Sequence, residues 1–181
     1  MNRKWLGWTI LVFLAFTVVF SGTVMAGKKN QSGATAILTE QEKEALLFMR
    51  EEEKLARDVY HYLYNFWGQW IFSNIETSEQ QHMDAILNLL VKYGLDDPVG
   101  NSGYGVFQNP DLQELYDFLL AKGINSELDA INVGIMIEET DIEDLIYYKE
   151  QTDKKDITQV FTNLLSGSEN HLAAFNSQLG I

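Results

Sequence analysis

The sequence contains no cysteine among its 181 residues. This absence excludes disulfide bonds, thiolate metal sites, iron–sulfur clusters, thiol nucleophiles and a lipid-modified cysteine behind a signal peptide. A folded chain of this size must therefore be stabilised by an apolar core, or by a metal ion that other side chains bind.

Basic residues are also scarce, with 13 Lys and Arg against 26 Asp and Glu and a formal net charge of −13. Nucleic acid is not expected as a partner, because phosphate binding needs a basic face. An acidic surface suits solubility and attracts cations. Strand-like alternation of polar and apolar residues is not evident, so we expect an all-α fold.

The first 26 residues have the layout of a secretory signal peptide. Two basic residues precede an apolar run at 5–20, and a small-residue pattern ends at Ala26. This layout predicts cleavage near Ala26 and export to the periplasm, cell surface or medium. The alternative is a membrane anchor formed by residues 5–20, which are nearly numerous enough to span a bilayer. Residues 27–37 are expected to be a flexible linker, and 38–181 the folded domain.

Caps and turn formers divide the domain into four long helices and a short one. The helices are expected from Thr39 to Trp67, from the Gly68 turn to Tyr93, from Ser126 to a polar break at 151–155, and from that break onward, with the short helix at Leu112–Ala121. Thr39 and Glu42 have the spacing of a capping box. The sequence thus predicts a four-helix bundle with an additional helix in the long crossover between its second and third helices.

Each long helix carries an apolar stripe in steps of three and four residues, which is typical of a helix that faces a core. Six ionisable residues interrupt these stripes: Glu53 in the first helix, Glu79 and His82 in the second, Glu138 and Asp141 in the third, and His171 in the fourth. Buried carboxylates are costly unless they are paired or coordinate a metal. These six residues are the candidate metal ligands.

The positions of these residues predict that they meet at one depth. The midpoint of Glu53 and Glu79 falls at residue 66, and that of Glu138 and His171 falls between 154 and 155. Both midpoints lie beside an expected turn, so both hairpins bring their ligands to one level, about 20 Å from the turns. Four carboxylates and two histidines inside a bundle are typical of a site for two metal ions. Iron suits this donor set, with manganese or zinc as alternatives.

Neighbouring side chains are weaker candidates for metal ligands. Glu52 is a reserve ligand, whereas Glu51 is expected to be solvated. Tyr60, one heptad beyond Glu53, can hydrogen-bond a ligand or take part in redox chemistry, and it is equally typical of a core aromatic residue. Two residues are expected to hydrogen-bond the metal ligands: Arg57 and Asp58. Three acidic residues are expected on the surface: Glu139, Glu143 and Asp144. Glu169 has the wrong spacing from His171 to form a Glu-x-x-His pair.

The segment from Leu38 to Phe175 resembles the ferritin-like superfamily, and it most resembles the family named domain of unknown function 2202. The matching phrases are EEEKLARDVY, SEQQHMDAI and GS-x-NHL-x-AF. Residues 53–60 are similar to the first-helix pattern of rubrerythrin-type proteins, and Glu79-x-x-His82 is similar to their second-helix pair. The fourth helix of the superfamily usually offers Glu-x-x-His, and here Ser168 stands at the glutamate position.

This resemblance implies a di-metal protein, most simply di-iron, that oxidises Fe(II) with dioxygen or peroxide as ferroxidases and peroxidases do, and the signal-peptide layout adds the expectation that it is exported. An oxidant or electron donor would come from outside the chain, because the chain has no cysteine for a second iron centre. Two alternatives stay open. One is a metal-binding or storage module without turnover that assembles into a homo-oligomer, and the other is a metal-free structural bundle.

Overall fold

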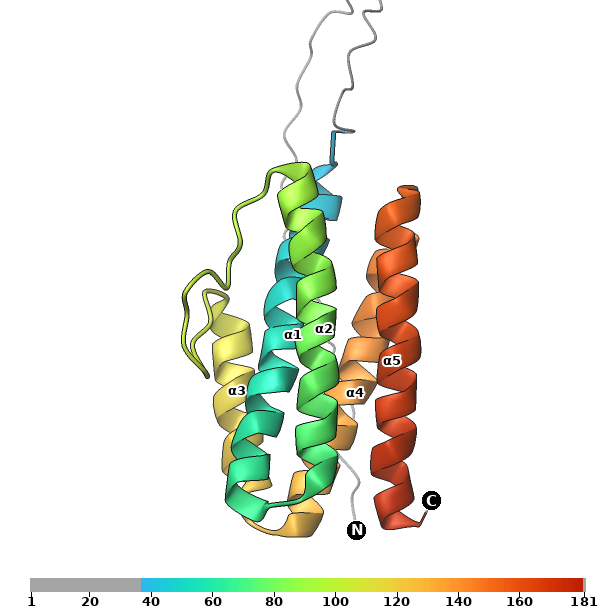
Figure 1. The fold of residues 1–181 in the computed structure, drawn as a ribbon. Coiled ribbons are helices and arrows are strands. Elements are labelled where there is room, and N and C mark those ends of the chain that lie inside the picture. The colour runs from blue at the N-terminus through green and yellow to red at the C-terminus, as the bar shows by residue number, and fades with distance from the viewer. Residues whose placement is uncertain (1–36, 181) are drawn as a thin grey trace, which may run out of the picture. The chain divides into compact units, whose positions relative to one another are not determined.

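The computed structural model describes residues 37–180 (Figure 1). This part of the chain forms five helices and no strand: α1 (Glu40–Trp67), α2 (Trp70–Tyr93), α3 (Pro110–Gly123), α4 (Glu127–Glu150) and α5 (Lys155–Leu179). The predicted all-α class is therefore confirmed. The expected signal peptide and most of the expected linker lie outside the described residues.

Local sequence signals set the ends of the long helices. The Glu42 amide donates to Thr39 Oγ1 at 3.1 Å, while the Thr39 amide donates to the Glu42 carboxylate at 2.8 Å. This reciprocal pair is the predicted capping box, which satisfies two otherwise unpaired amides. α1 ends at Gly68, whose φ of 72° is accessible to glycine without strain. Ser126 caps α4 by accepting the Asp129 amide at 3.0 Å, also as predicted.

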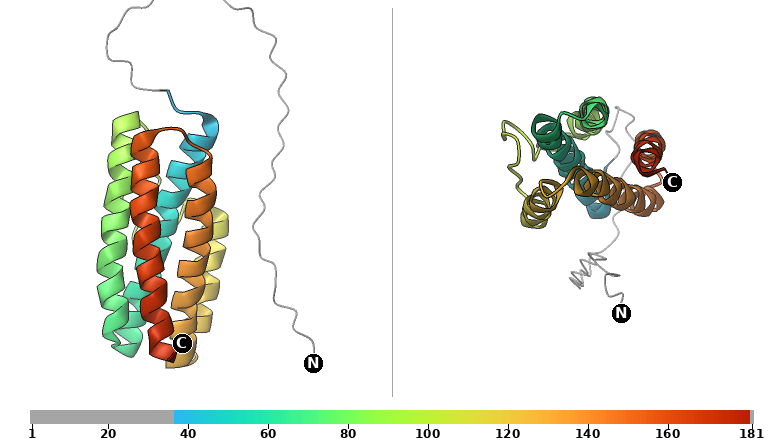
Figure 2. Two further views of the ribbon diagram at one scale, coloured as in Figure 1. Left: turned by 90° about the vertical axis from the view of Figure 1, so that its right-hand side faces the viewer. Right: turned by 90° about the horizontal axis from the view of Figure 1, so that it is seen from below.

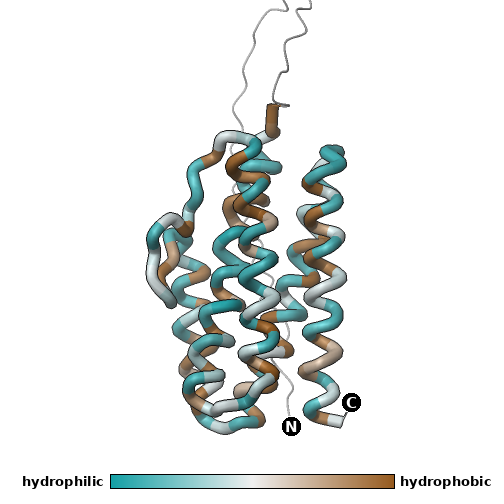
Figure 3. Tube along the Cα trace, in the orientation of Figure 1, coloured by the Kyte–Doolittle hydropathy of each residue, from teal (hydrophilic) through white to brown (hydrophobic). Residues whose placement is uncertain are grey.

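The long helices pack as two hairpins. α1 packs against α2 and α4 against α5, while α1–α4 and α2–α5 contacts join the pairs. The left view of Figure 2 shows α5 between α2 and α4. Hydrophobic and hydrophilic residues alternate along each helix (Figure 3), because each helix has one face in the core.

The core consists of two apolar clusters. One contains Leu63, Phe72, Ile137 and Phe175, and the other contains Leu46, Met49, Ile86, Leu145 and Phe161. Along every long helix, the interrupting ionisable residues lie in sequence between the members of these two clusters. The ionisable groups are thus enclosed by hydrocarbon on both sides, where water cannot readily solvate them.

Buried charged groups of α1 bind the loop between α2 and α3. Arg50 pairs with Asp97 through two nitrogens at 3.0 and 2.9 Å. Lys54, which is fully buried, donates to the Gly103 carbonyl at 2.8 Å and pairs with Asp58. α3 packs on α1 and α4 beyond this loop. Its observed start at Pro110 is two residues earlier than predicted, because Asn109 caps it and proline suits the first helical position.

Two predictions about α1 are wrong. Glu51 is only 5% exposed rather than solvated, because it accepts the backbone amides of Gln108 and Asn109 in this loop. Asp58 does not hydrogen-bond a candidate ligand within the described residues; it accepts from Lys54, Arg57 and the Gly105 amide. Both carboxylates satisfy buried donors that the irregular loop and its lysine would otherwise leave unpaired. None of the helices in residues 37–180 is both long enough and apolar enough to cross a membrane.

Candidate metal centre

The structure brings five of the six predicted ligands into two groups. One group consists of Glu53, Glu79 and His82, and the other of Glu79, Glu138 and His171. Within each group, one potential ligand atom per residue lies within 4.8 Å of the others. Glu79 belongs to both groups. α1 and α2 supply the first group, and α2, α4 and α5 supply the second.

Glu79 lies between the two histidines. Its Oε2 atom is 2.9 Å from Nδ1 of His82, and its Oε1 atom is 2.8 Å from Nδ1 of His171. The outer carboxylates complete the row, with Glu53 Oε2 at 3.1 Å from His82 Nδ1 and Glu138 Oε2 at 3.4 Å from His171 Nδ1. A carboxylate that faces one imidazole with each oxygen is placed to bridge two cations.

Asp141 is the sixth predicted ligand and lies beside these groups rather than within them. It is 5% exposed, and its Oδ2 atom accepts a hydrogen bond from the Ser168 hydroxyl. Its Oδ1 atom is buried and has no hydrogen-bond partner. The Ser168 hydroxyl of α5 therefore helps to position the Asp141 carboxylate of α4. One carboxylate oxygen of Asp141 stays free for a cation.

The groups compensate one another electrostatically when no cation is present. Burial raises the pKa of Glu79, but hydrogen bonds from His171 and His82 outweigh this and lower the pKa to about 2. Burial lowers the pKa of His82, yet the Glu53 and Glu79 carboxylates raise it to about 11. Glu138 and Glu79 likewise raise the pKa of His171 to about 9 against the effect of its burial. Each histidine holds a proton at the point where a metal ion would replace it.

The outer carboxylates have the opposite shift. Burial raises the pKa of Glu53 to about 8 despite the attraction of His82. Burial and the Glu79 charge raise the pKa of Glu138 to about 7. Two histidines cannot fully balance the four buried carboxylates of the centre. Bound cations would supply the missing positive charge.

Unpaired buried atoms give a direct test of whether a metal fits. Two carboxylate oxygens of the centre are buried without any partner, Glu53 Oε1 and Asp141 Oδ1, and two further buried atoms, Glu79 Oε1 and His171 Nδ1, face each other at 2.8 Å. Nearly all buried polar atoms in native proteins are paired, so several unpaired atoms in one place need an explanation. Carboxylate oxygen with some imidazole nitrogen suits iron and manganese, and accommodates zinc. The residues present fit a metal site.

Neighbouring side chains orient the ligands. The fully buried Tyr60 hydroxyl donates to Glu138 Oε1 at 2.6 Å, which is the first of the roles expected for this tyrosine. Ser78 Oγ lies 2.9 Å from Nε2 of His171, so this nitrogen donates to the hydroxyl when Nδ1 binds a metal. The sequence analysis missed Ser78, although it immediately precedes Glu79.

Gly167 is another residue that the sequence analysis missed. A Cβ atom at this position would lie 2.5 Å from Nε2 of His82. The glycine therefore leaves the space that the His82 ring occupies against α5. A glycine in the interior of a helix is unfavourable by about 1 kcal/mol relative to alanine. A glycine inside a predicted helix was therefore the sequence feature that could have indicated a special role for position 167.

The other acidic residues divide by burial. Glu139 and Glu143 are exposed, as predicted, and Glu169 is exposed too. Asp144 was predicted on the surface but is half-buried, and its carboxyl group interacts with that of Glu52. The prediction missed this because the two residues lie on different helices. Glu52, the reserve ligand, is buried and belongs to neither three-residue group.

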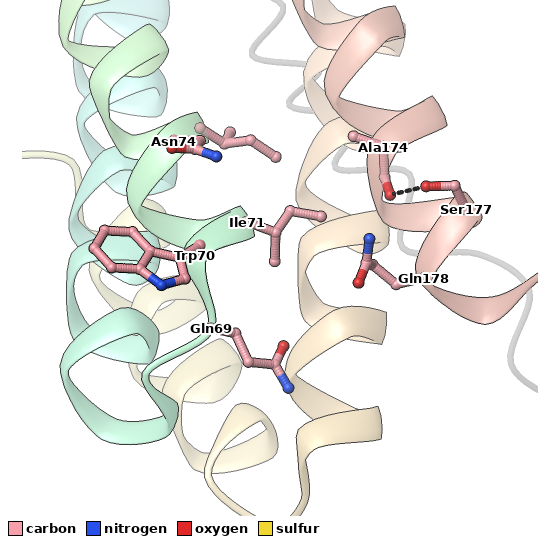
Figure 4. A pocket seen from close by; sticks show the side chains of 8 residues that line it. Gln69, Trp70, Ile71, Asn74, Ala174, Ser177 and Gln178 are labelled. Carbon is pink, nitrogen blue, oxygen red and sulfur yellow. Dashed lines mark hydrogen bonds between the residues drawn. The ribbon is translucent and has the colours of Figure 1, made fainter.

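An open cleft of about 630 Å³ lies between the first turns of α2 and the last turns of α5 (Figure 4). Eight residues line it: Gln69, Trp70, Ile71, Asn74, Ile75, Ala174, Ser177 and Gln178. No carboxylate or histidine is among them. The cleft is therefore separate from the candidate metal centre, and we assign it no metal.

Known proteins resemble this chain over the whole helical domain. Residues 42–180 match the family described as "Uncharacterized protein domain (DUF2202)". The uncharacterized protein MJ0754 of Methanocaldococcus jannaschii is 55% identical over 138 residues, which cover 76% of this chain and 75% of that protein. The crystal structure of that hypothetical protein superposes with a TM-score of 0.78 at 50% identity and covers 86% of each chain. The chain belongs to the DUF2202 family.

Proposed function

We propose that this protein is a ferritin-like di-metal carboxylate protein whose two hairpins form a four-helix bundle around two metal ions, most simply iron. The observation that carries the proposal is the position of Glu79, which faces the Nδ1 atom of a different histidine with each of its oxygens. A purely structural ion pair would need only one such partner. The unpaired buried atoms of Glu53 and Asp141 add support.

The residues of the chain would have distinct roles in such a centre. Glu79 would bridge the two ions, and His82 and His171 would be terminal ligands through Nδ1. Glu53 and Glu138 would be the outer carboxylates, and Asp141 would supply the additional oxygen that Ser168 holds in place. Tyr60 and Ser78 would fix the orientation of Glu138 and His171.

Bound iron would supply the redox chemistry, by passing between Fe(II) and Fe(III) when dioxygen or peroxide is present. The chain would supply geometry and a dry environment. The apolar clusters on both sides exclude water, which strengthens every electrostatic interaction in the centre. Electrons beyond those of the iron would come from an external donor, because the chain has no cysteine for a second iron centre.

The proposal is tested by metal analysis of natively purified protein, followed by anaerobic Fe(II) loading and exposure to oxygen. We expect two metal ions per chain and a charge-transfer absorbance after oxygen is added. The double variant Glu79→Ala/His82→Ala should lose both signals. A wild-type chain that holds no iron, manganese or zinc in stoichiometric amount would refute the proposal. Two bound ions without oxidation would instead indicate a metal-binding or storage module, for which a large oligomer in size-exclusion chromatography is expected.

Export remains a separate proposal. It rests on the signal-peptide layout of residues 1–26, which the structure does not describe. Amino-terminal sequencing of the protein from its native host should find Gly27 as the first residue. An intact amino terminus in the membrane fraction would instead support an anchor at residues 5–20.

A further inference from the structure

A small cavity lies outside the two ligand groups. It has a volume of about 40 Å³ and is enclosed by α1, α3 and α4. Most of its wall is apolar, but three polar side chains line it: Glu52, Thr140 and Asp141. This volume is enough for an ion or a water molecule, since a single water needs roughly 10–15 Å³.

Two carboxylates present unpaired oxygens at this cavity. Glu52 and Asp141 are each 5% exposed, and Glu52 Oε2 and Asp141 Oδ1 are buried without a hydrogen-bond partner. Glu52 makes no ion pair with Lys, Arg or His anywhere in residues 37–180. A buried acidic pair without a counter-ion is costly, and a cation between its members would remove the cost.

The cavity is lined both by an exposed residue and by a candidate ligand of the metal centre. Thr140 is exposed on α4, and its hydroxyl donates to the Met136 carbonyl at 2.9 Å. Because the hydroxyl acts as the donor in this bond, its oxygen can still bind a cation. Half-buried Asp144 lies one turn further along α4 and adds negative charge beside Glu52. Asp141 borders both places, because it lines the cavity while its charge interacts with those of Glu53 and Glu138. The polar lining of the cavity thus runs from exposed Thr140 to Asp141, a candidate ligand of the centre.

We propose that Glu52 and Asp141 bind a divalent cation in this cavity on its way to the metal centre, and that the cavity is the access site of the centre. The cation would be an oxygen-preferring first-row ion such as Fe(II) or Mn(II). This inference rests on the proposed di-metal function and adds the route by which the ions arrive. The competing explanation is that Glu52 and Asp144 share a proton and that the cavity holds only water.

The test compares the isosteric variant Glu52→Gln with Glu139→Gln as the matched control. Both changes replace a carboxyl group by an amide of the same shape on a helix that lines the cavity, but Glu139 is exposed and does not itself line it. Metal-free proteins are mixed with Co(II) under anaerobic conditions in a stopped-flow instrument, and the visible absorbance of bound Co(II) is followed. The metal content at equilibrium and the melting temperature of each variant are measured in parallel.

Wild type and both variants should reach two Co(II) per chain. Loading of Glu52→Gln should be slower than wild type by about tenfold or more, because a cleft lined by negative charge raises the on-rate of a cation by at least that factor. Loading of Glu139→Gln should match wild type. Wild-type kinetics in Glu52→Gln would overturn the access site alone. A final content below two in Glu52→Gln would also overturn it, by making Glu52 a ligand of the centre itself. A wild-type chain that binds no Co(II) would overturn the proposed function as well.

Discussion

Replacement of Glu79 by glutamine tests the centre at its shared residue. The substitution keeps the shape of the side chain but removes the charge that faces His82 and His171 at 2.9 and 2.8 Å. The pKa of Glu79 is lowered from 4.5 to about 2, which corresponds to about 3 kcal/mol in favour of its ionised form. Removing one member of a buried charged set typically costs about 3–5 kcal/mol. We therefore expect the free energy of unfolding of the metal-free protein to fall by about 3 kcal/mol.

Such a loss would lower the melting temperature by roughly 6–12 °C, at about 2–4 °C per kcal/mol for a domain of this size. Scanning calorimetry in the presence of a chelator measures it, and metal titration should show fewer than two ions bound to Glu79→Gln. The matched control is Glu76→Gln, one turn earlier on α2, whose partner is the partly exposed His61 at 2.9 Å. That pair should contribute no more than about 1 kcal/mol. A Glu79→Gln protein that is equally stable and still binds two ions with unchanged affinity would refute the bridging role.

Further predictions concern pH, the space beside a ligand, and the buried loop anchor. The pKa of His171 is raised from 6.5 to about 9, and that of His82 from 6.5 to about 11. The stability that these two protonated histidines contribute is therefore fully present below pH 6.5 and is lost as the pH rises through 9 to 11. Thermal melts of chelated protein should show this decline, and a flat profile would contradict it. Gly167→Ala should weaken metal affinity by about tenfold, because the new Cβ would lie 2.5 Å from Nε2 of His82 and displace the ring. The free energy of unfolding should change little, because alanine favours the helix by about 1 kcal/mol relative to glycine. Isothermal titration measures the metal affinity of this variant, and a urea melt measures its stability. An unchanged metal affinity would mean that the His82 ring can move away from the new Cβ without cost. Lys54→Met should lower the free energy of unfolding in urea by about 1–3 kcal/mol, because Asp58 keeps Arg57 but loses Lys54, and the Gly103 carbonyl loses its donor. A neutral result would show that the Lys54–Asp58 pair only breaks even.

Much of the fold was predictable because helix ends are encoded locally. Thr39 with Glu42, and Ser126 with Asp129, satisfy their own backbone amides whatever the rest of the chain does. The spacing of three and four residues likewise identifies the face of each helix that lies in the core. That periodicity was sufficient to single out all six candidate ligands, because a charged residue inside a buried stripe is visible in the sequence.

The pairing of side chains from different helices was not predictable in the same way. Equal depth suggested Glu53 opposite Glu79, but the turn at Gly68 places His82 at 3.1 Å from Glu53 and leaves Glu79 free to face both histidines. Helix periodicity fixes a face and a height, whereas the partner depends on the rotation and offset of the neighbouring helix.

The sequence by itself determined the number of helices, most of their ends, and which side chains face inward, since these follow from caps and periodicity. The tertiary structure alone decided that Ser168 holds Asp141, that Glu51 binds the loop before α3, and that Glu52 lies buried at a cavity. These contacts join residues between 27 and 89 positions apart in the chain. Such contacts depend on how the helices and the loop pack together, so no local pattern in the sequence specifies them.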